Sequence, residues 1–259
     1  MEKLMNDILL DVRGLSKHFG GILALNEVSF SLEKGSVTSL IGPNGAGKTT
    51  FINVVTGIHA PDSGEIHFQG EDLAGMEAHL VASKGIGRTF QLVELFSSLN
   101  VLENAMVGRH SESHSGMLSC GFSLPSARKE EKRIRDEAME SLIMVGLEKR
   151  APDPISKLPL GERKLVGVAR ALTMKPRFLM LDEPAGGLAA HEIKNLVELI
   201  HQLVSKGLTI LVVEHNMPFI MSLSEKVIVL NEGAKIAEGP PQEVRTNEKV
   251  IKAYLGEEV

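Results

Sequence analysis

The sequence predicts an α/β fold: a core of buried strands and helices, an antiparallel β subdomain beside it, and a helical subdomain inserted into it. Three observations predict this fold. A glycine-rich segment lies between a buried strand and a helix, two later apolar runs end in acidic residues, and residues 92–157 change to charged, helical periodicity.

Length and composition limit the classes of function. At 259 residues the chain is one large domain or two lobes that share a core, and a hydrophobic content of 43% is ample for burial. A net charge of −5 argues against a nucleic-acid partner. Cys120 is the single cysteine, which excludes an internal disulfide and a zinc site built from several cysteines.

The sequence also indicates where in the cell the chain is expected. No apolar run reaches the ~18 residues that a spanning helix needs. Residues 1–11 carry acidic side chains and lack a signal-peptide pattern. We therefore expect a cytoplasmic chain that touches a membrane only through a partner.

Near the N-terminus, Ile8–Val12, Val28–Leu32 and Gly64–Phe68 have the character of strands and predict an antiparallel sheet. Phe19 lies between the first two, beside a pair of glycines. It could stack on an adenine ring, or it could be a core aromatic at a strand end. Spacing alone favours the core position.

The segment Gly42–Thr49 fits the phosphate-binding pattern G-x-x-x-x-G-K-[ST] in full, between a strand over 36–41 and a helix over 49–56. Glycines let the backbone wrap around a polyphosphate, and the helix N-terminus points N–H groups at its oxygens. A glycine-rich turn that merely connects strand to helix is the alternative, but every fixed position and both flanks are present. The residues expected to bind the nucleotide here are Gly42, Pro43, Asn44, Gly45, Ala46, Gly47, Lys48, Thr49 and Thr50.

The next segments predict a helix over 76–84 and a strand over 85–90 that ends at Gln91. Ligands bind at the carboxyl ends of strands in open α/β sheets. A glutamine at such an end is nevertheless more often a surface residue than a metal ligand, so Gln91 alone is a weak candidate.

Residues 92–157 predict a helical subdomain. Helices are expected over 101–107 and 126–145, and the second has one apolar stripe with interleaved charges on its other face. The stripe consists of Ile134, Ala138, Leu142 and Val145.

Two buried strands with acidic ends follow. A helix over 163–174 precedes the run Phe178–Leu181, which ends in Asp182 and Glu183. Asp182 can hold Mg²⁺ and Glu183 can accept a proton from an attacking water. A helix over 191–205 and a strand over 209–213 then lead to His215, a candidate contact to a γ-phosphate. The tail predicts a hairpin near 231–233 and a helix over 248–255.

Together these motifs resemble the ATP-binding subunit of an ABC transporter over essentially the whole chain. Phe19 matches the adenine-stacking position, Gln91 the Q-loop, Asp182 the Walker B acid, Glu183 the catalytic base and His215 the switch histidine. Four short segments look more narrowly like the ATPases of branched-chain amino-acid importers: Phe19–Gly21, Arg88–Gln91, Glu183–Ala185 and Ala253–Gly256.

The resemblance implies a P-loop NTPase with a RecA-like core. It divides the chain into a nucleotide-binding core with its β subdomain (1–91 and 158–230), a helical subdomain (92–157) and a C-terminal hairpin and helix (231–259). It also implies a head-to-tail dimer that closes on two ATP and drives transmembrane permease subunits at the inner face of the cell membrane. Mg²⁺ would be held by Thr49, Gln91 and Asp182, and catalysis would use Glu183, His215 and Gln91.

The signature segment Leu158–Glu162 departs from the family's usual Leu-Ser-Gly-Gly-Gln. Pro159 stands where a serine hydroxyl would reach the γ-phosphate, a loss of roughly 1.5–3 kcal/mol. The N–H of Gly161 can still point at phosphate from the helix N-terminus. Ala189 is a second departure, since a polar residue is usual there. We therefore expect a heterodimer with a different ATPase subunit, with a homodimer as the alternative.

Rival functions are less well supported. A GTPase would carry Asn-Lys-x-Asp, a DNA-repair ABC ATPase a long coiled coil, and a translation-type ABC protein two cassettes, and the sequence has none of these. A regulatory subunit that clamps ATP with little turnover is disfavoured by Glu183 and His215. Transport of another substrate stays open, because specificity resides in the partner subunits.

Overall fold

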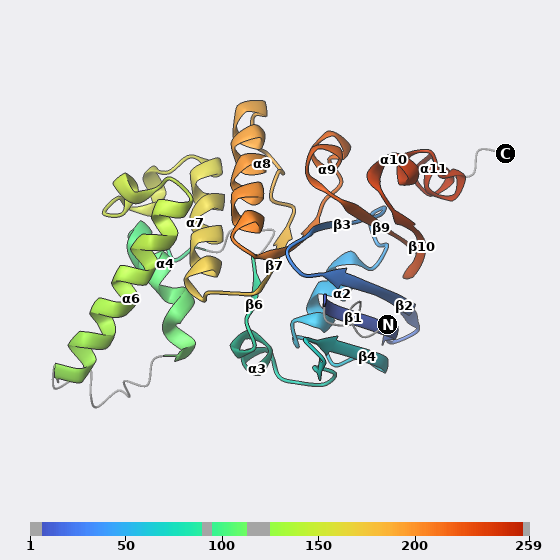
Figure 1. The fold of residues 1–259 in the computed structure, drawn as a ribbon, viewed down its shortest axis with the longest axis horizontal. Helices are drawn as coiled ribbons and strands as arrows, with labels where there is room; N and C mark the ends of the chain where they lie inside the picture. Colours follow the sequence, from blue (N-terminus) through green and yellow to red (C-terminus); the bar gives the residue numbers. More distant parts are fainter. Residues whose placement is uncertain (1–6, 90–94, 113–124, 256–259) are drawn as a thin grey trace. The chain divides into compact units, whose positions relative to one another are not determined.

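The computed structural model describes residues 7–89, 95–112 and 125–255 (Figure 1). The described residues fall into two compact units, one formed by 7–88, 177–186 and 193–255 and one by 89–176 and 187–192.

The strands are β1 (Ile8–Phe19), β2 (Ile22–Glu33), β3 (Val37–Ile41), β4 (Ser63–Phe68), β5 (Glu71–Asp72), β6 (Ile86–Arg88), β7 (Phe178–Asp182), β8 (Thr209–Val213), β9 (Lys226–Asn231) and β10 (Ala234–Gly239). The α-helices are α2 (Lys48–Val55), α3 (Ala78–Ser83), α4 (Val101–Met106), α6 (Pro125–Met144), α7 (Leu160–Thr173), α8 (Ala190–Ser205), α9 (Met217–Leu223), α10 (Pro241–Arg245) and α11 (Glu248–Leu255), and the 3₁₀ helices are η1 (Val107–Glu112), η2 (Glu148–Arg150) and η3 (Ile155–Lys157).

The first unit is built on a six-stranded sheet in the order β10-β9-β3-β8-β7-β6. Its strands run parallel except for β10, which pairs antiparallel with β9 at one edge. Every residue of β3, β7 and β8 is buried. The apolar runs of β7 and β8 predict this for strands covered on both faces, and β3 also buries Thr38 and Ser39. Because these strands are parallel, the segments that follow them emerge at one edge of the sheet.

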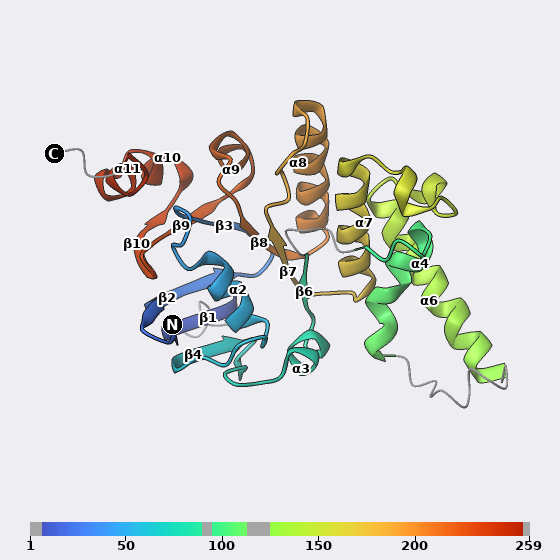
Figure 2. The same cartoon turned by 180° about the vertical axis from the view of Figure 1, so that it is seen from behind.

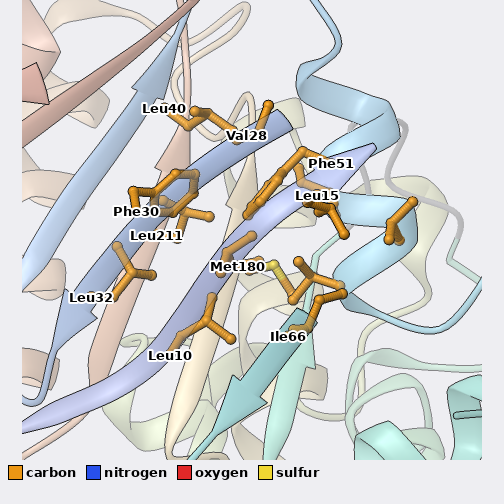
Figure 3. Close-up of a cluster of buried hydrophobic side chains, with 14 of the residues drawn as sticks. Leu10, Leu15, Val28, Phe30, Leu32, Leu40, Phe51, Ile66, Met180 and Leu211 are labelled. Atoms are coloured by element: carbon orange, nitrogen blue, oxygen red, sulfur yellow. The ribbon is translucent and has the colours of Figure 1, made fainter. Parts of the chain in front are cut away.

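A second sheet, in the order β2-β1-β4-β5, is antiparallel and confirms the expected β subdomain. Its apolar side chains share one core with α2 and the parallel strands (Figure 3). Phe51 of α2 packs against Phe30 of β2 with ring centroids 5.0 Å apart. The helix that follows the glycine-rich segment is therefore fixed by burial.

Strands β1 and β2 are longer than the sequence predicts. They continue to Phe19 and from Ile22, and these two residues pair across a hairpin whose turn is Gly20 and Gly21. Gly20 has φ 57°, a backbone conformation that favours glycine at this turn. The register shifts at several points along the pair, which interrupts the alternation from which strand ends are predicted.

The second unit contains α4, α6 and α7, which pack on one another. The stripe of α6 is confirmed, with Ala138 and Leu142 fully buried. On the same helix, Glu137 accepts a hydrogen bond from Arg109 and another from Lys175. The Arg109 guanidinium lowers the pKa of Glu137 to about 2 and Lys175 adds to this, although burial opposes it.

Helix α7 differs from the prediction in two respects. It begins at Leu160 instead of Arg163, and it groups with the helical unit although the sequence placed residues from 158 in the core. Pro159 is the N-cap residue with φ −64°, and Glu162 lies in the first turn, where an acid suits the helix dipole. Buried side chains of α7, including Val166 and Leu172, supply the face that packs on α4 and α6.

The C-terminal part agrees closely with the prediction. The hairpin β9–β10 turns over Glu232 and Gly233, and α11 has the expected bounds. Helices α10 and α11 lie beside the β9–β10 hairpin (Figure 1, Figure 2). Val250 of α11 packs in a cluster with Ile41, the last residue of β3. Among the described residues no helix is long and apolar enough to cross a membrane, and Cys120 lies outside the described residues.

Candidate nucleotide-binding site

The candidate site lies at the carboxyl edge of the parallel strands in the first unit. The glycine-rich segment 42–47 follows β3, Glu183 follows Asp182 at the end of β7, and His215 comes two residues after β8. Since β8 pairs with both β3 and β7, these three segments emerge from adjacent strands. The structure thus brings together four of the residues predicted from widely separated motifs: Lys48, Asp182, Glu183 and His215.

Glycines are required in the phosphate-binding loop for two different reasons. A Cβ atom on Gly42 would lie 2.1 Å from the Leu230 carbonyl oxygen, and one on Gly47 would lie 2.5 Å from the Ala24 carbonyl oxygen. Gly45 has open space around it, but its φ of 80° is one that L side chains rarely adopt. Gly47 is also the N-cap of α2 and carries no capping side chain, so the first N–H groups of this helix can serve an anion.

The ammonium group of Lys48 is held against the loop itself. Its Nζ donates hydrogen bonds to the carbonyl oxygens of Gly42 at 2.7 Å and Pro43 at 2.9 Å. Burial lowers the pKa of Lys48, whereas the negative charges of Glu183 and Asp182 oppose that shift. The site therefore places a cation among two carboxylates and a loop that presents backbone N–H groups.

Asp182 is a buried carboxylate, 5% exposed, whose Oδ2 lies 3.2 Å from Nη2 of Arg88. Burial raises the pKa of Asp182, and the Arg88 guanidinium opposes this. Arg88 also donates from Nη1 to Oδ1 of Asn53 on α2, at 2.6 Å. Sequence reasoning gave no role to Arg88 or Asn53. The local signals for Arg88 are its place at the end of the short strand β6 and in the segment Arg88–Gln91 noted for its resemblance.

Glu183 has φ 46°, an uncommon backbone conformation for a residue with a Cβ. Its N–H donates to the Val213 carbonyl oxygen at 2.8 Å, which ties the end of β7 to the end of β8. Its Oε1 lies 3.8 Å from Nδ1 of His215. Both side chains are accessible, at 27% for Glu183 and 63% for His215, so a substrate can reach them.

Phe19 is 43% exposed at the end of the β1–β2 hairpin, so the core position that spacing favoured is wrong. Its ring meets His59 edge-on with centroids 5.2 Å apart, and the ammonium of Lys17 lies 5.6 Å from its centre. An exposed ring that is oriented by its neighbours is suited to stack on a planar base.

Two further residues near this edge escaped sequence reasoning. Glu214, beside the expected His215, is 1% exposed, and its carboxylate is fully enclosed. Burial raises the pKa of the Tyr254 phenol on α11, and an interaction with the backbone of Gly42 opposes this shift. Tyr254 belongs to the segment Ala253–Gly256 noted for its resemblance, but the sequence predicted no role for it.

Two predicted site residues are not among those just described. Gln91 lies outside the described residues. Gly161 belongs to the second unit, in the first turn of α7, where a Cβ would lie 2.1 Å from Oε1 of Glu192. The other oxygen of Glu192 accepts a hydrogen bond from the Ala189 N–H at 2.8 Å. A carboxylate thus lies at the N-terminus of α7, as the helix dipole favours.

The donor set of the site fits Mg²⁺. No group of three or more His, Cys, Asp or Glu side chains within the described ranges could hold a metal alone. Thr49 offers an exposed hydroxyl at the start of α2, and Asp182 offers a carboxylate at the same sheet edge. Mg²⁺ commonly takes one or two protein oxygens and completes its shell with phosphate oxygens and water.

Comparison with known proteins gives concordant results. The family described as "ABC transporter" matches residues 25–186, and the family "Branched-chain amino acid ATP-binding cassette transporter" matches residues 234–259. The high-affinity branched-chain amino acid transport ATP-binding protein BraF of Pseudomonas aeruginosa is 41% identical over 254 residues, which are 98% of this chain and 100% of BraF. The protein LivG of Escherichia coli K12, described in the same words, gives the same identity and coverage.

Solved structures agree with these relatives. A nucleotide-free ATP-binding cassette from an ABC transporter superposes with a TM-score of 0.86 at 33% identity, covering 96% of this chain and 100% of that one. An ATP-binding cassette in its ADP conformation gives a TM-score of 0.83 at 33% identity, covering 96% and 99%.

Proposed function

This chain belongs to the ABC transporter family, and we propose that it is the ATP-hydrolysing subunit of an importer for branched-chain amino acids. The observation that carries the proposal is the meeting of Lys48, Asp182, Glu183 and His215 at one sheet edge. The names of BraF and LivG support the choice of substrate, because each is 41% identical to this chain over its whole length.

The proposed division of labour follows from the side-chain chemistry. The loop 42–47 and the N-terminus of α2 cradle the phosphates, and Lys48 turns its ammonium from Gly42 and Pro43 towards the γ-phosphate. Phe19 stacks on the adenine ring. Bound Mg²⁺, held by Thr49, Asp182 and Gln91, would supply positive charge that offsets the charge of the phosphates.

Glu183 and His215 are the proposed catalytic pair. Glu183 accepts the proton of the attacking water, and His215 donates a hydrogen bond towards the γ-phosphate. Their 3.8 Å separation supports action on one water, and their exposure is consistent with entry of the phosphate. Gln91 would contact the metal and help to orient this water.

The proposed partners are transmembrane permease subunits and a second ATPase subunit. A bacterial ABC transporter cassette that is 25% identical, with a TM-score of 0.76, was solved as a dimer, which supports pairing of such cassettes. In the proposed dimer the N-terminus of α7, with Gly161, faces the phosphates bound by the partner subunit. The chain would lie on the inner face of the membrane and touch it only through the permeases.

Loss of the chain is expected to abolish high-affinity leucine uptake. In cells lacking the gene, uptake of radiolabelled leucine at micromolar concentration should fall to the diffusion background and lysine uptake should stay normal. A plasmid with the wild-type gene should restore leucine uptake, and one with Glu183→Gln should not. Normal leucine uptake in the deletion strain would contradict the proposed substrate and support transport of another solute.

Substitution of Pro159 tests whether the chain works in a heterodimer with a different ATPase subunit. We propose that the intact phosphate-binding loop works with a partner subunit's signature and that the altered segment 158–162 completes a weaker second site. Pro159→Ser is then expected to raise the ATPase rate of the reconstituted transporter severalfold, because the hydroxyl adds a donor to a charged phosphate. Pro159→Ala is the control, since it removes the ring without adding a hydroxyl. Equal rates for all three proteins would contradict the weaker second site.

A further inference from the structure

Glu214 is a buried charge to which the proposed mechanism gives no role. Among the acids that the structure describes, only Asp182 and Glu214 are buried, at 5% and 1% exposure. Burying a carboxylate is unfavourable unless it receives hydrogen bonds or pairs with a cation. Asp182 has Arg88 beside it. The contacts of Glu214 are of a different kind.

Glu214 is satisfied by backbone N–H groups from two loops. Its Oε1 accepts from the Ala185 N–H at 2.8 Å, and Ala185 lies two residues after Glu183. Its Oε2 accepts from the N–H groups of His215 at 2.9 Å and Asn216 at 3.2 Å. One carboxylate oxygen therefore accepts a hydrogen bond from the loop after β7, and the other accepts hydrogen bonds from the loop after β8.

The two loops that Glu214 joins carry the two proposed catalytic side chains. Glu183 adopts a φ of 46°, and such a conformation persists only where the surroundings enforce it. The bond from Ala185 restrains the turn that follows Glu183, in which the Gly186 N–H also donates to the Glu183 carbonyl oxygen at 3.3 Å. The bond to the His215 N–H fixes the backbone from which the imidazole extends.

We propose that Glu214 is a positioning residue for ATP hydrolysis, which holds the backbones of Glu183 and His215 in register through its two carboxylate oxygens. The inference rests on the proposed roles of Glu183 and His215. It does not make Glu214 a catalytic residue, because its carboxylate is enclosed. Its hydrogen bonds come from the chain's own backbone, and Oε2 also lies 3.8 Å from Nδ1 of His215.

Glu214→Gln tests this role with almost no change of shape. An amide has one accepting oxygen, so in either orientation its NH₂ group faces Ala185 or the pair His215 and Asn216, all of which are donors. We expect kcat for ATP hydrolysis to fall about tenfold or more, since small misplacements of reacting groups have large effects. The KM for ATP should change less than about threefold, because the phosphate-binding loop follows a different strand.

Hydrogen exchange separates positioning from general stability. In the variant, the amides of Glu183, Ala185 and Gly186 and those of 214–216 should exchange faster, while those of β3 stay protected. Glu238→Gln is the matched control: Glu238 is paired with Lys226 and Lys235 on the β9–β10 hairpin, so its loss should leave kcat unchanged.

Three results would overturn the proposal: a kcat within twofold of wild type, a rise in KM as large as the fall in kcat, or faster exchange throughout β3. Glu183→Gln, measured in the same assay, reports on the proposed function separately. If that variant keeps wild-type turnover, the proposed base is wrong whatever Glu214→Gln shows. If it loses turnover while Glu214→Gln does not, only the positioning role fails.

Discussion

Glu183→Gln is expected to lower the ATPase rate by about a hundredfold or more while ATP still binds, because a glutamine amide cannot accept the proton of the attacking water. The side chain follows the buried Asp182 and lies 3.8 Å from His215, so the substitution keeps its size and position and removes only its basicity. The measurement is steady-state phosphate release, with equilibrium binding of ATP to the same preparation.

Glu27→Gln is the matched control for this prediction. Glu27 also has a positive φ, 48°, and loses the same charge, but it is an exposed residue on β2 of the antiparallel sheet. Its variant should hydrolyse ATP at the wild-type rate. Equal turnover by wild type and Glu183→Gln would instead mean that Glu183 is not the base. It would favour a subunit that clamps ATP with little turnover.

Lys48→Ala is expected to weaken ATP binding by roughly 100-fold, since hydrogen bonds to charged groups are worth up to ~3 kcal/mol and ~1.4 kcal/mol is tenfold. The ammonium already lies on the loop, bonded to Gly42 and Pro43, and so needs little rearrangement to meet a phosphate. Its loss also leaves the negative charges of Asp182 and Glu183 facing the triphosphate with less compensation. Isothermal titration with ATP measures the effect.

Lys84→Ala provides the control for Lys48. Lys84 ends α3 and pairs with Glu71 at the surface, so its removal changes the net charge by the same amount without touching the site. Such surface pairs contribute little to stability. ATP affinity should be unchanged in this variant, and a comparable loss in both variants would attribute the effect to overall charge.

Sequence reasoning succeeded where a local pattern has one physical outcome. Apolar runs that end in acids predicted β7 and β8, because a run of four consecutive apolar residues is typical of a strand buried on both faces. The motif 42–49 predicted a tight glycine-rich turn between β3 and α2, and the structure confirms a steric requirement for glycine at Gly42 and Gly47.

Sequence reasoning failed where contacts between distant segments determine the structure. The position of α7 depends on packing with α4 and α6, which its own residues do not specify. Glu214 resembles any acid at a strand end, and one of its donors, Ala185, lies 29 residues earlier in the chain. The contact of Tyr254 with Gly42 spans almost the whole chain. Arg88 meets both Asn53 and Asp182 through tertiary structure alone.

Identification of the nucleotide retained by the protein tests the central claim most directly, namely that this sheet edge binds ATP through Lys48 and hydrolyses it through Glu183. After incubation with MgATP and rapid desalting, the bound nucleotide is extracted and identified by chromatography. The account predicts ADP from the wild type, ATP from Glu183→Gln and neither from Lys48→Ala. Recovery of ADP from Glu183→Gln, or of ATP from Lys48→Ala at the level of Glu183→Gln, would contradict it.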